Sequence, residues 1–263
     1  IEHLGGCVYD GVWVGEQSSI PHIDGIRAAT IAALKRLQTP VIRWPGGLFA
    51  DNYHWHDGIG PRTDRPIRQN LGWNTLETNR FGTHEFMQFC AQIGAEPYLC
   101  LNLGSGTVEE AVAWAEYCNC ALETTLTRER AANGHPEPFG VKFWSLGNEP
   151  GYPMDGMMRP GHYADVARRF AGYVKHIATQ APYAQDARFR QAGVKMTLAD
   201  YRSAKEAVQD GRESYFDLLA VHLYAGRSIA PEASASEHYR ALIAELAQWK
   251  NEIRSASELA AQL

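Results

Sequence analysis

The sequence predicts an α/β protein that folds as a (β/α)8 TIM barrel, here incomplete, with about strands 1 to 6 and their helices present. Segments rich in β-branched and aromatic residues alternate with segments of helical apolar spacing, which implies parallel strands and right-handed crossovers. An open doubly wound sheet also alternates, but it needs a glycine-rich turn after its first strand, and Gly46-Gly47 follow the second. Polar residues recur at the strand ends, as at a barrel mouth; they are Arg43, Asn102, Asn148-Glu149, Asp200 and His222 with Tyr224.

The strands are expected where short apolar runs are bounded by polar or turn-forming residues. Pro45-Gly46-Gly47 closes the second strand, and Pro150 cannot continue the fourth because it has no amide donor. In chain order, the expected strands are Val8–Val14, Val41–Trp44, Pro97–Asn102, Val141–Asn148, Val194–Leu198 and Phe216–Tyr224.

Helices are expected between these strands, and capping residues mark several of them. Thr83 begins a helix that Gly94 ends, and the capping box Thr107–Glu110 begins the next. Two long polar segments are expected to be loops, residues 48–81 with a functional role and residues 123–138 on the surface. The remaining expected helices start at Ile26 with Asp24 as cap, at Pro160, near Ala204–Val208, and around the apolar stripe Tyr239–Ile253.

Composition excludes several partners. The 263 residues carry a net charge of -5 without a basic run, so no nucleic acid is expected, and no apolar run approaches the ~18 residues of a membrane span. Five scattered Cys favour free thiols and a cytoplasmic location, although the chain begins at Ile1 and leaves a preceding leader open. His54, His56 and His84 come without a carboxylate cluster, so hydrogen bonding is expected for them, and no metal or other cofactor.

The strand that ends at Asn148 and Glu149 carries the functional prediction. A carboxylate there could pair with an arginine or cap the next helix, but at a barrel mouth it could be a catalytic acid. Glycoside cleavage needs one carboxylic acid to protonate the leaving oxygen and one carboxylate to attack or to activate water. Asn148 could donate to a sugar hydroxyl, and Arg43 could keep a carboxylate ionised. His222 and Tyr224 alternate along one strand, so both could face the mouth.

Seven short motifs resemble, in order, the α-L-arabinofuranosidases of glycoside hydrolase family 51, over essentially the whole chain. They are Glu2–Gly5, Arg43–Gly47, Tyr53–Pro61, Glu77–Gly82, Gly94–Tyr98, Gly147–Glu149 and His222–Tyr224. The resemblance implies a (β/α)8 barrel with an appended β-sandwich. It also implies retaining, exo-acting hydrolysis of terminal α-L-arabinofuranosyl groups without a metal, on a carbohydrate substrate. A homo-oligomer is expected for the full-length enzyme.

The resemblance gives roles to individual residues. Glu149 matches the acid/base Glu, Asn148 the neighbouring sugar-binding Asn, and Glu2 a Glu that holds ring hydroxyls. The other matches are Arg43 to the Arg near the nucleophile, Tyr224 to the Tyr that hydrogen-bonds the nucleophile, His222 beside it, and Trp73 to an aromatic contact on the leaving-group side.

Three positions depart from the family pattern. Leu48 stands where the family has a sugar-contacting Cys or Asn, and Pro150-Gly151 replace its Asn-Trp, which puts aglycone preference in doubt. The family's Asp-Glu-Trp motif, which holds the nucleophile, does not occur in this sequence. Glu258 lies near the right distance, but Ser255–Leu263 is predicted to be helical, so Glu258 is expected to be a solvated helix residue.

These departures lead to an expectation about domains. Residues 1–263 are expected to be a partial (β/α)8 catalytic domain that lacks the C-terminal barrel strands and the β-sandwich, with the nucleophile beyond Leu263. The chain alone is then expected to be catalytically silent. The alternatives are another retaining glycosidase, such as an endoglucanase or xylosidase, and a non-catalytic sugar-binding barrel.

Overall fold

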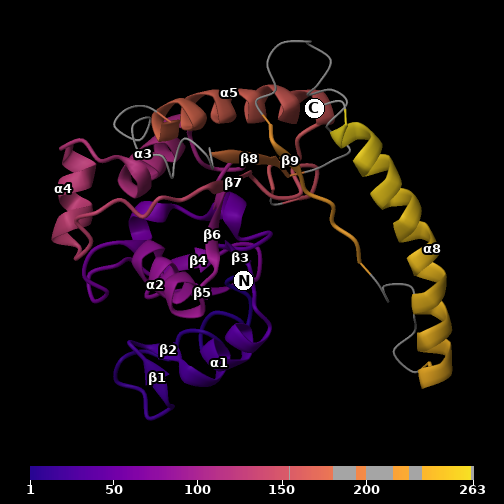
Figure 1. Ribbon diagram of the computed structural model, residues 1–263, viewed down its shortest axis with the longest axis horizontal. Helices are drawn as coiled ribbons and strands as arrows, with labels where there is room; N and C mark the ends of the chain where they lie inside the picture. Colours follow the sequence, from indigo (N-terminus) through magenta and orange to yellow (C-terminus); the bar gives the residue numbers. More distant parts are fainter. Residues whose placement is uncertain (154, 180–193, 200–215, 225–232, 262–263) are drawn as a thin grey trace.

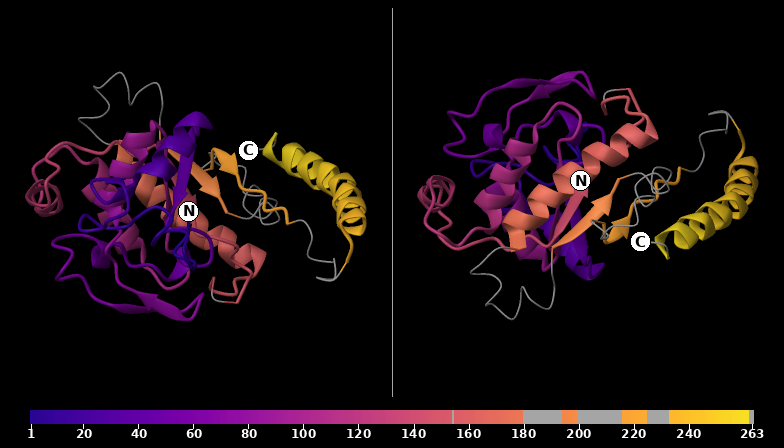
Figure 2. Two further views of the ribbon diagram at one scale, coloured as in Figure 1. Left: turned by 90° about the horizontal axis from the view of Figure 1, so that it is seen from below. Right: turned by 90° about the horizontal axis from the view of Figure 1, so that it is seen from above.

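A five-stranded parallel sheet lies at the centre of the computed structural model, which describes residues 1–153, 155–179, 194–199, 216–224 and 233–261 (Figures 1 and 2). The strands are β3 (Val41–Trp44), β6 (Glu96–Leu101), β7 (Phe143–Leu146), β8 (Lys195–Leu198) and β9 (Leu218–Leu219). They lie in the order β3-β6-β7-β8-β9, so each pairs in parallel with the strand of this sheet that follows it in the sequence. A doubly wound sheet would reverse its order at a switch point. The predicted α/β fold of barrel type is confirmed over the described residues.

Six α-helices accompany the strands in the described residues. They are α1 (Ala28–Arg36), α2 (Thr83–Ile93), α3 (Val108–Asn119), α4 (Thr125–Ala132), α5 (Pro160–Thr179) and α8 (Ala235–Ala260), with one-turn 3₁₀ helices η1 (Ala50–Asn52) and η2 (Trp55–Gly58). As predicted, α2 ends at Gly94, whose φ is +77°, and the Thr107 side chain caps α3 by accepting from the Glu110 amide. Helices α2 and α5 pack against the sheet. Helix α3 packs against α4 and α5, and α5 runs along one side of the sheet (Figure 1). None of the helices in the described parts of the chain is both long and apolar enough to cross a bilayer.

Aromatic side chains pack between the sheet and the helices α2 and α3. The ring of Trp44 stacks on that of Phe86 with centroids 5.1 Å apart, and Trp114 meets Trp144 edge to face at 6.0 Å. All four side chains are at most 2% exposed. Such close-packed rings fix the strands firmly, and with them the residues at the strand ends.

The segment from residue 48 to 81 is folded and not an open loop. It contains η1, η2 and a hairpin of β4 (Arg68–Asn70) and β5 (Thr75–Glu77), whose turn carries Trp73. The buried Glu77 side chain contacts Nδ1 of His3 at 2.6 Å, which ties this hairpin to the beginning of the chain.

The first expected strand is wrong. Residues Val8–Val14 form turns with isolated bridges, and β1 (His22–Ile23) and β2 (Ile26–Arg27) form a small hairpin outside the main sheet. Because Ile26 pairs with Ile23, helix α1 begins only at Ala28, and Asp24 lies in the hairpin turn with φ +49° instead of capping a helix. As a result β7, expected as the fourth strand, is the third strand of the described sheet.

Three further expectations need correction or lie outside the described residues. Residues 123–138 contain α4, whose Arg130 is 1% exposed and donates to backbone carbonyls, so this segment is not only a surface loop. Of Phe216–Tyr224, only β9 pairs in the sheet. The expected helix near Ala204–Val208 lies outside the described residues. Helix α8 forms as predicted, but its apolar stripe is largely exposed.

Candidate active site

Glu149 follows the carboxyl end of β7, beyond a glycine turn. Leu146, the last strand residue, is fully buried, and Gly147 then turns the chain with φ +78°. A Cβ at Gly147 would lie 3.1 Å from Oδ1 of Asp51, so a larger residue would be both strained and crowded. The turn places Asn148 and Glu149 at the carboxyl edge of the sheet.

Two side chains from the segment after β9 hold the Glu149 carboxylate. Nδ1 of His222 lies 2.8 Å from Oε1 of Glu149, and the Tyr224 hydroxyl donates to the same oxygen at 2.6 Å. His222 and Tyr224 thus face the same side, as their alternation in the sequence predicts. The resemblance implies that Tyr224 hydrogen-bonds the nucleophilic carboxylate, whereas in this structure its hydroxyl donates to Glu149. The Glu149 side chain is 21% exposed, so it can exchange protons with a bound molecule or water.

The Asn148 side chain is 3% exposed and is held from two sides. Its Oδ1 accepts from Nη2 of Arg43 at 3.0 Å, and its Nδ2 donates to Oδ2 of Asp155 at 3.1 Å. Its backbone amide donates to Oδ2 of Asp51 at 2.8 Å. Arg43 comes from β3, so this network joins the ends of two strands that are far apart in sequence.

Glu2 lies beside this network. Its Oε1 accepts from the Trp73 indole at 3.1 Å and from the Phe49 amide at 3.0 Å. A Cβ at Gly47 would lie 3.3 Å from Oε2 of Glu2 and 3.6 Å from Oδ1 of Asn148, so both side chains rest against this glycine. A Cβ here would press on the Glu2 carboxylate by a few tenths of an ångström and would touch Asn148 at an ordinary contact distance.

Asp51 connects the loop after β3 to the ends of β6 and β7. Its Oδ1 accepts from the amides of Leu103 and Gly104 at 2.7 and 3.1 Å, in addition to the Asn148 amide on Oδ2. Burial raises the pKa of Asp51 to about 6, although these three amides favour the ionised form.

The structure brings the predicted site residues into one neighbourhood. Contacts link Trp73 to Glu2, Glu2 to Asn148 across Gly47, and Asn148 to Arg43, while Glu149 follows Asn148 directly. The full set is Glu2, Arg43, Trp73, Asn148, Glu149, His222 and Tyr224. Their roles in binding and catalysis stay predictions.

Asn102 does not take part, although the sequence favoured a role in the site. Its Oδ1 accepts from the amides of Ser105 and Gly106, and its Nδ2 donates to the Tyr53 carbonyl. Asn102 is 7% exposed and organises the loop after β6, because its hydrogen-bonding atoms are used by that loop and by the Tyr53 carbonyl of the segment after β3. Asp200 lies outside the described residues.

Sequence reasoning missed two carboxyl groups of this region, Asp51 and Asp155. Asp51 lies inside the loop whose length indicated a function, but nothing singled it out there. Asp155 follows Glu149 by only six residues, in a segment where the motif pattern is lost. Both are 1% exposed, and only the fold shows that they flank Asn148.

Metal-ligand clusters are absent from the described part of the chain, where no group of three or more His, Cys, Asp or Glu could hold an ion. The predicted hydrogen bonding of two histidines is confirmed. Nδ1 of His54 lies 3.0 Å from Oε1 of Glu110, and Nε2 of His84 lies 2.6 Å from the Tyr117 hydroxyl. Burial lowers the pKa of His84 to about 4, so this ring is neutral at physiological pH.

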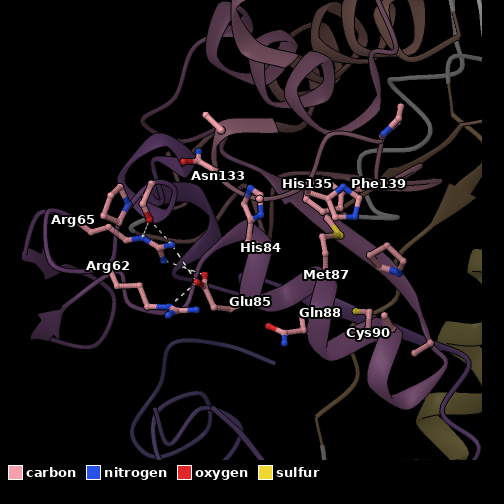
Figure 3. A pocket seen from close by; sticks show the side chains of 18 residues that line it. Arg62, Arg65, His84, Glu85, Met87, Gln88, Cys90, Asn133, His135 and Phe139 are labelled. Atoms are coloured by element: carbon pink, nitrogen blue, oxygen red, sulfur yellow. Dashed lines mark hydrogen bonds and ion pairs between the residues drawn. The ribbon is translucent and has the colours of Figure 1, made fainter. Parts of the chain in front are cut away.

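A separate cavity of about 920 Å³ lies between α2, α4 and the loop around residue 62 (Figure 3). Arg62 and Arg65 both pair with Glu85 along its wall. Ala95, which also lines the cavity, precedes β6, so the cavity lies at the amino end of the sheet. Barrel enzymes carry their chemistry at the carboxyl end, so we do not assign this cavity to the active site.

Residues 33–241 match the family described as "Alpha-L-arabinofuranosidase 1 domain". This match spans well over half of the sequence. The chain belongs to this family.

Curated relatives bear related names. An "Intracellular exo-alpha-L-arabinofuranosidase" of Bacteroides ovatus is 48% identical over 176 residues, which cover 66% of this chain and 34% of that protein. "Alpha-L-arabinofuranosidase C" of Emericella nidulans is 49% identical over 148 residues, which cover 56% of this chain and 29% of that protein. The chain therefore spans about a third of the length of these relatives.

Solved structures share the fold over nearly the whole chain. The GH51 arabinofuranosidase from Xanthomonas axonopodis pv. citri superimposes with a TM-score of 0.87 at 35% identity, covering 98% of this chain and 52% of that one. The α-L-arabinofuranosidase from Thermotoga maritima, solved as an arabinose complex, gives a TM-score of 0.83 at 35% identity and covers 98% and 49%. The predicted likeness to glycoside hydrolase family 51 is confirmed.

Proposed function

We propose that the protein is a retaining, exo-acting α-L-arabinofuranosidase that removes terminal arabinofuranosyl groups from plant polysaccharides or oligosaccharides. The observation that carries this proposal is the position of Glu149 at the carboxyl end of β7, in contact with His222 and Tyr224, in a chain of this family. The carboxyl ends of barrel strands are where such enzymes hold their acids.

Glu149 is the acid/base of the proposed reaction. In the first step its proton passes to the glycosidic oxygen while a second carboxylate attacks the anomeric carbon, and the aglycone leaves. In the second step the Glu149 carboxylate takes a proton from water, whose oxygen displaces the enzyme carboxylate from the sugar. We assign the attacking carboxylate to no residue described here.

The neighbouring groups suit a furanose ring. Glu2 offers acceptors, and the Oδ1 of Asn148 lies against the same glycine as the Glu2 carboxylate. Arg43 supplies positive charge next to Asn148. Trp73, with 37% of its surface exposed, offers a ring face and an indole N–H directed at Glu2. These residues form the proposed substrate-binding set, together with His222 and Tyr224.

Replacement of Glu149 by alanine tests the acid/base role in the protein at its natural length. Glu149→Ala should lower kcat/KM for arabino-oligosaccharides by about 10²–10⁴-fold, the usual contribution of general acid–base catalysis. Nitrophenyl arabinofuranosides should lose less, because their leaving group needs little protonation. Glu258→Ala is the matched control, since Glu258 lies exposed on α8. Equal losses on both substrates, or a loss in the control, would count against the role.

A panel of nitrophenyl glycosides tests the substrate class. The α-L-arabinofuranoside should be cleaved, with retained anomeric configuration in the first product, while the xyloside and glucoside should not. Cleavage of the xyloside alone would favour another retaining glycosidase, and cleavage of none would favour a sugar-binding barrel.

We further propose a cytoplasmic, homo-oligomeric protein. The Bacteroides ovatus relative is named intracellular, and all five Cys of this chain are free thiols. Light scattering after size exclusion gives the assembly state, and a monomer at micromolar concentration would refute the oligomer.

A further inference from the structure

Asp155 is a buried carboxyl group that the proposed chemistry does not use. It is 1% exposed and lies in the turn after Glu149, where the Tyr152 amide donates to the Glu149 carbonyl and the Asp155 amide to the Tyr152 carbonyl. Its Oδ2 accepts from Nδ2 of Asn148 at 3.1 Å. Within the described residues its Oδ1 is buried and has no hydrogen-bond partner.

The surroundings of Asp155 disfavour a negative charge. Among the described residues, the charged groups with the largest effect on it are Asp51, Glu149 and Glu2, all carboxyl groups, and its hydrogen-bond donor is a neutral amide. A buried carboxylate normally has a cation or several donors. Burial, followed by the repulsion from Asp51, raises the pKa of Asp155 to about 8, against the smaller effect of the Asn148 bond. Asp155 is therefore mainly protonated near pH 7.

The Asn148 amide has one orientation that suits both of its partners. Its oxygen accepts from the Arg43 guanidinium, and its nitrogen donates to Asp155. A flip of this amide would place its NH2 against the guanidinium, donor against donor, so Arg43 selects the orientation, and Asp155 then supplies the acceptor for the amide nitrogen. Without Asp155, the nitrogen side of Asn148 would have no acceptor to fix it.

We propose that Asp155 is a positioning residue, which holds the nitrogen end of the Asn148 side-chain amide in place beside Glu149, in the orientation that Arg43 selects. The inference rests on the proposed function, because it concerns the presentation of Asn148 to the sugar. It has a consequence for pH. Above about pH 8, Asp155 becomes a buried carboxylate near the carboxyl groups of Asp51, Glu149 and Glu2. The residues around it must then rearrange or admit water, so activity falls.

Two variants of Asp155 and one control test the proposal in the protein at its natural length. Asp155→Asn keeps an acceptor for Asn148 but cannot ionise, Asp155→Ala removes the acceptor, and Asp165→Asn makes the same chemical change on the exposed face of α5. The readouts are kcat and KM for nitrophenyl α-L-arabinofuranoside between pH 5 and 10, and the calorimetric affinity for L-arabinose.

The proposal expects different behaviour from the two variants. Asp155→Ala should raise KM and lower kcat/KM about fivefold to tenfold at pH 6, the effect of losing one hydrogen bond that orders a binding group. Asp155→Asn should stay within about threefold of the wild type at pH 6 and should lack the decline near pH 8. The control should follow the wild type throughout.

Several outcomes would overturn it. If Asp155→Ala keeps the KM and kcat/KM of the wild type, Asn148 does not depend on its hydrogen bond to Asp155. If activity still declines near pH 8 in Asp155→Asn, the ionisation of Asp155 is not the cause of that decline. If Asp155→Ala does not fold, the pH profile of Asp155→Asn decides. If the wild type cleaves no arabinofuranoside, the proposed function fails on its own. The affinity for L-arabinose then decides, and equal affinities of wild type and Asp155→Ala would refute the positioning role.

Discussion

A methyl group at Gly147 should disturb the turn that carries Glu149. Gly147 and Gly94 have nearly the same left-handed conformation, with φ of +78° and +77°. A Cβ at Gly94 would meet nothing within 4 Å, whereas at Gly147 it would lie 3.1 and 3.2 Å from the two oxygens of Asp51 and 3.3 Å from the Leu103 Cβ. Gly94→Ala is thus a control with the same backbone strain and no crowding.

The expected magnitudes follow from these two contributions. An L-residue in the left-handed region costs about 1–2 kcal/mol, which applies to both substitutions. Crowding adds about 1–3 kcal/mol only at Gly147, because Asp51 is held by three backbone amides and cannot move aside easily. We expect Gly147→Ala to lose about 2–5 kcal/mol of unfolding free energy and Gly94→Ala about 1–2 kcal/mol.

Thermal unfolding and activity measure the difference. At about 2–4 °C per kcal/mol, the midpoint should fall by about 4–20 °C for Gly147→Ala and by about 2–8 °C for Gly94→Ala. Hydrolysis of arabinofuranosides should also fall in Gly147→Ala, whose turn precedes Glu149, and should persist in Gly94→Ala below its midpoint. Equal midpoint shifts in the two variants would refute the crowding argument, and unchanged activity in Gly147→Ala would show that the turn tolerates displacement.

Three further changes have distinct signatures. Phe86→Ala should lose about 3–5 kcal/mol in urea unfolding, because Phe86 is fully buried in the aromatic core, and a loss under 1 kcal/mol would contradict that packing. Trp73→Phe should raise KM about threefold with little change in stability, because it removes the indole bond to Glu2 from a partly exposed ring; an unchanged KM would exclude a role of the indole N–H in binding. Burial is the largest single influence on the pKa of Glu77 and raises it, but the contacts with His3, Tyr9 and the Asn79 amide together outweigh burial and hold that pKa below the ordinary 4.5. The ionised Glu77 therefore contributes its full stabilisation above about pH 4.5, and this contribution is lost as the pH falls further. Glu77→Gln should flatten the acid limb of the curve of unfolding free energy against pH. A variant curve parallel to that of the wild type would contradict the lowered pKa of Glu77.

Much of the fold can be read from local patterns. The capped helices α2 and α3 and the helix α5 from Pro160 form where predicted, because caps and apolar spacing act over a few residues. The expected strand at Val8–Val14 failed because strands need a partner, and Trp13 bridges to Ile26 instead of joining the sheet. The α8 stripe shows the same limit, since apolar spacing predicts a helix but not whether another element covers it.

For the site, the sequence by itself determined the residue types, their order and their family pattern. Glu149 could be singled out because it ends an apolar strand inside a recognisable motif. The tertiary structure alone decided that Asn102 serves its own loop and that Asp51 reaches Asn148, 97 residues away. It also showed Asp155 as a buried carboxyl group whose hydrogen-bond donor, within the described residues, is the neutral Asn148 amide. Hydrogen-bond partners and desolvation depend on what the fold brings alongside each group, and no local pattern encodes that.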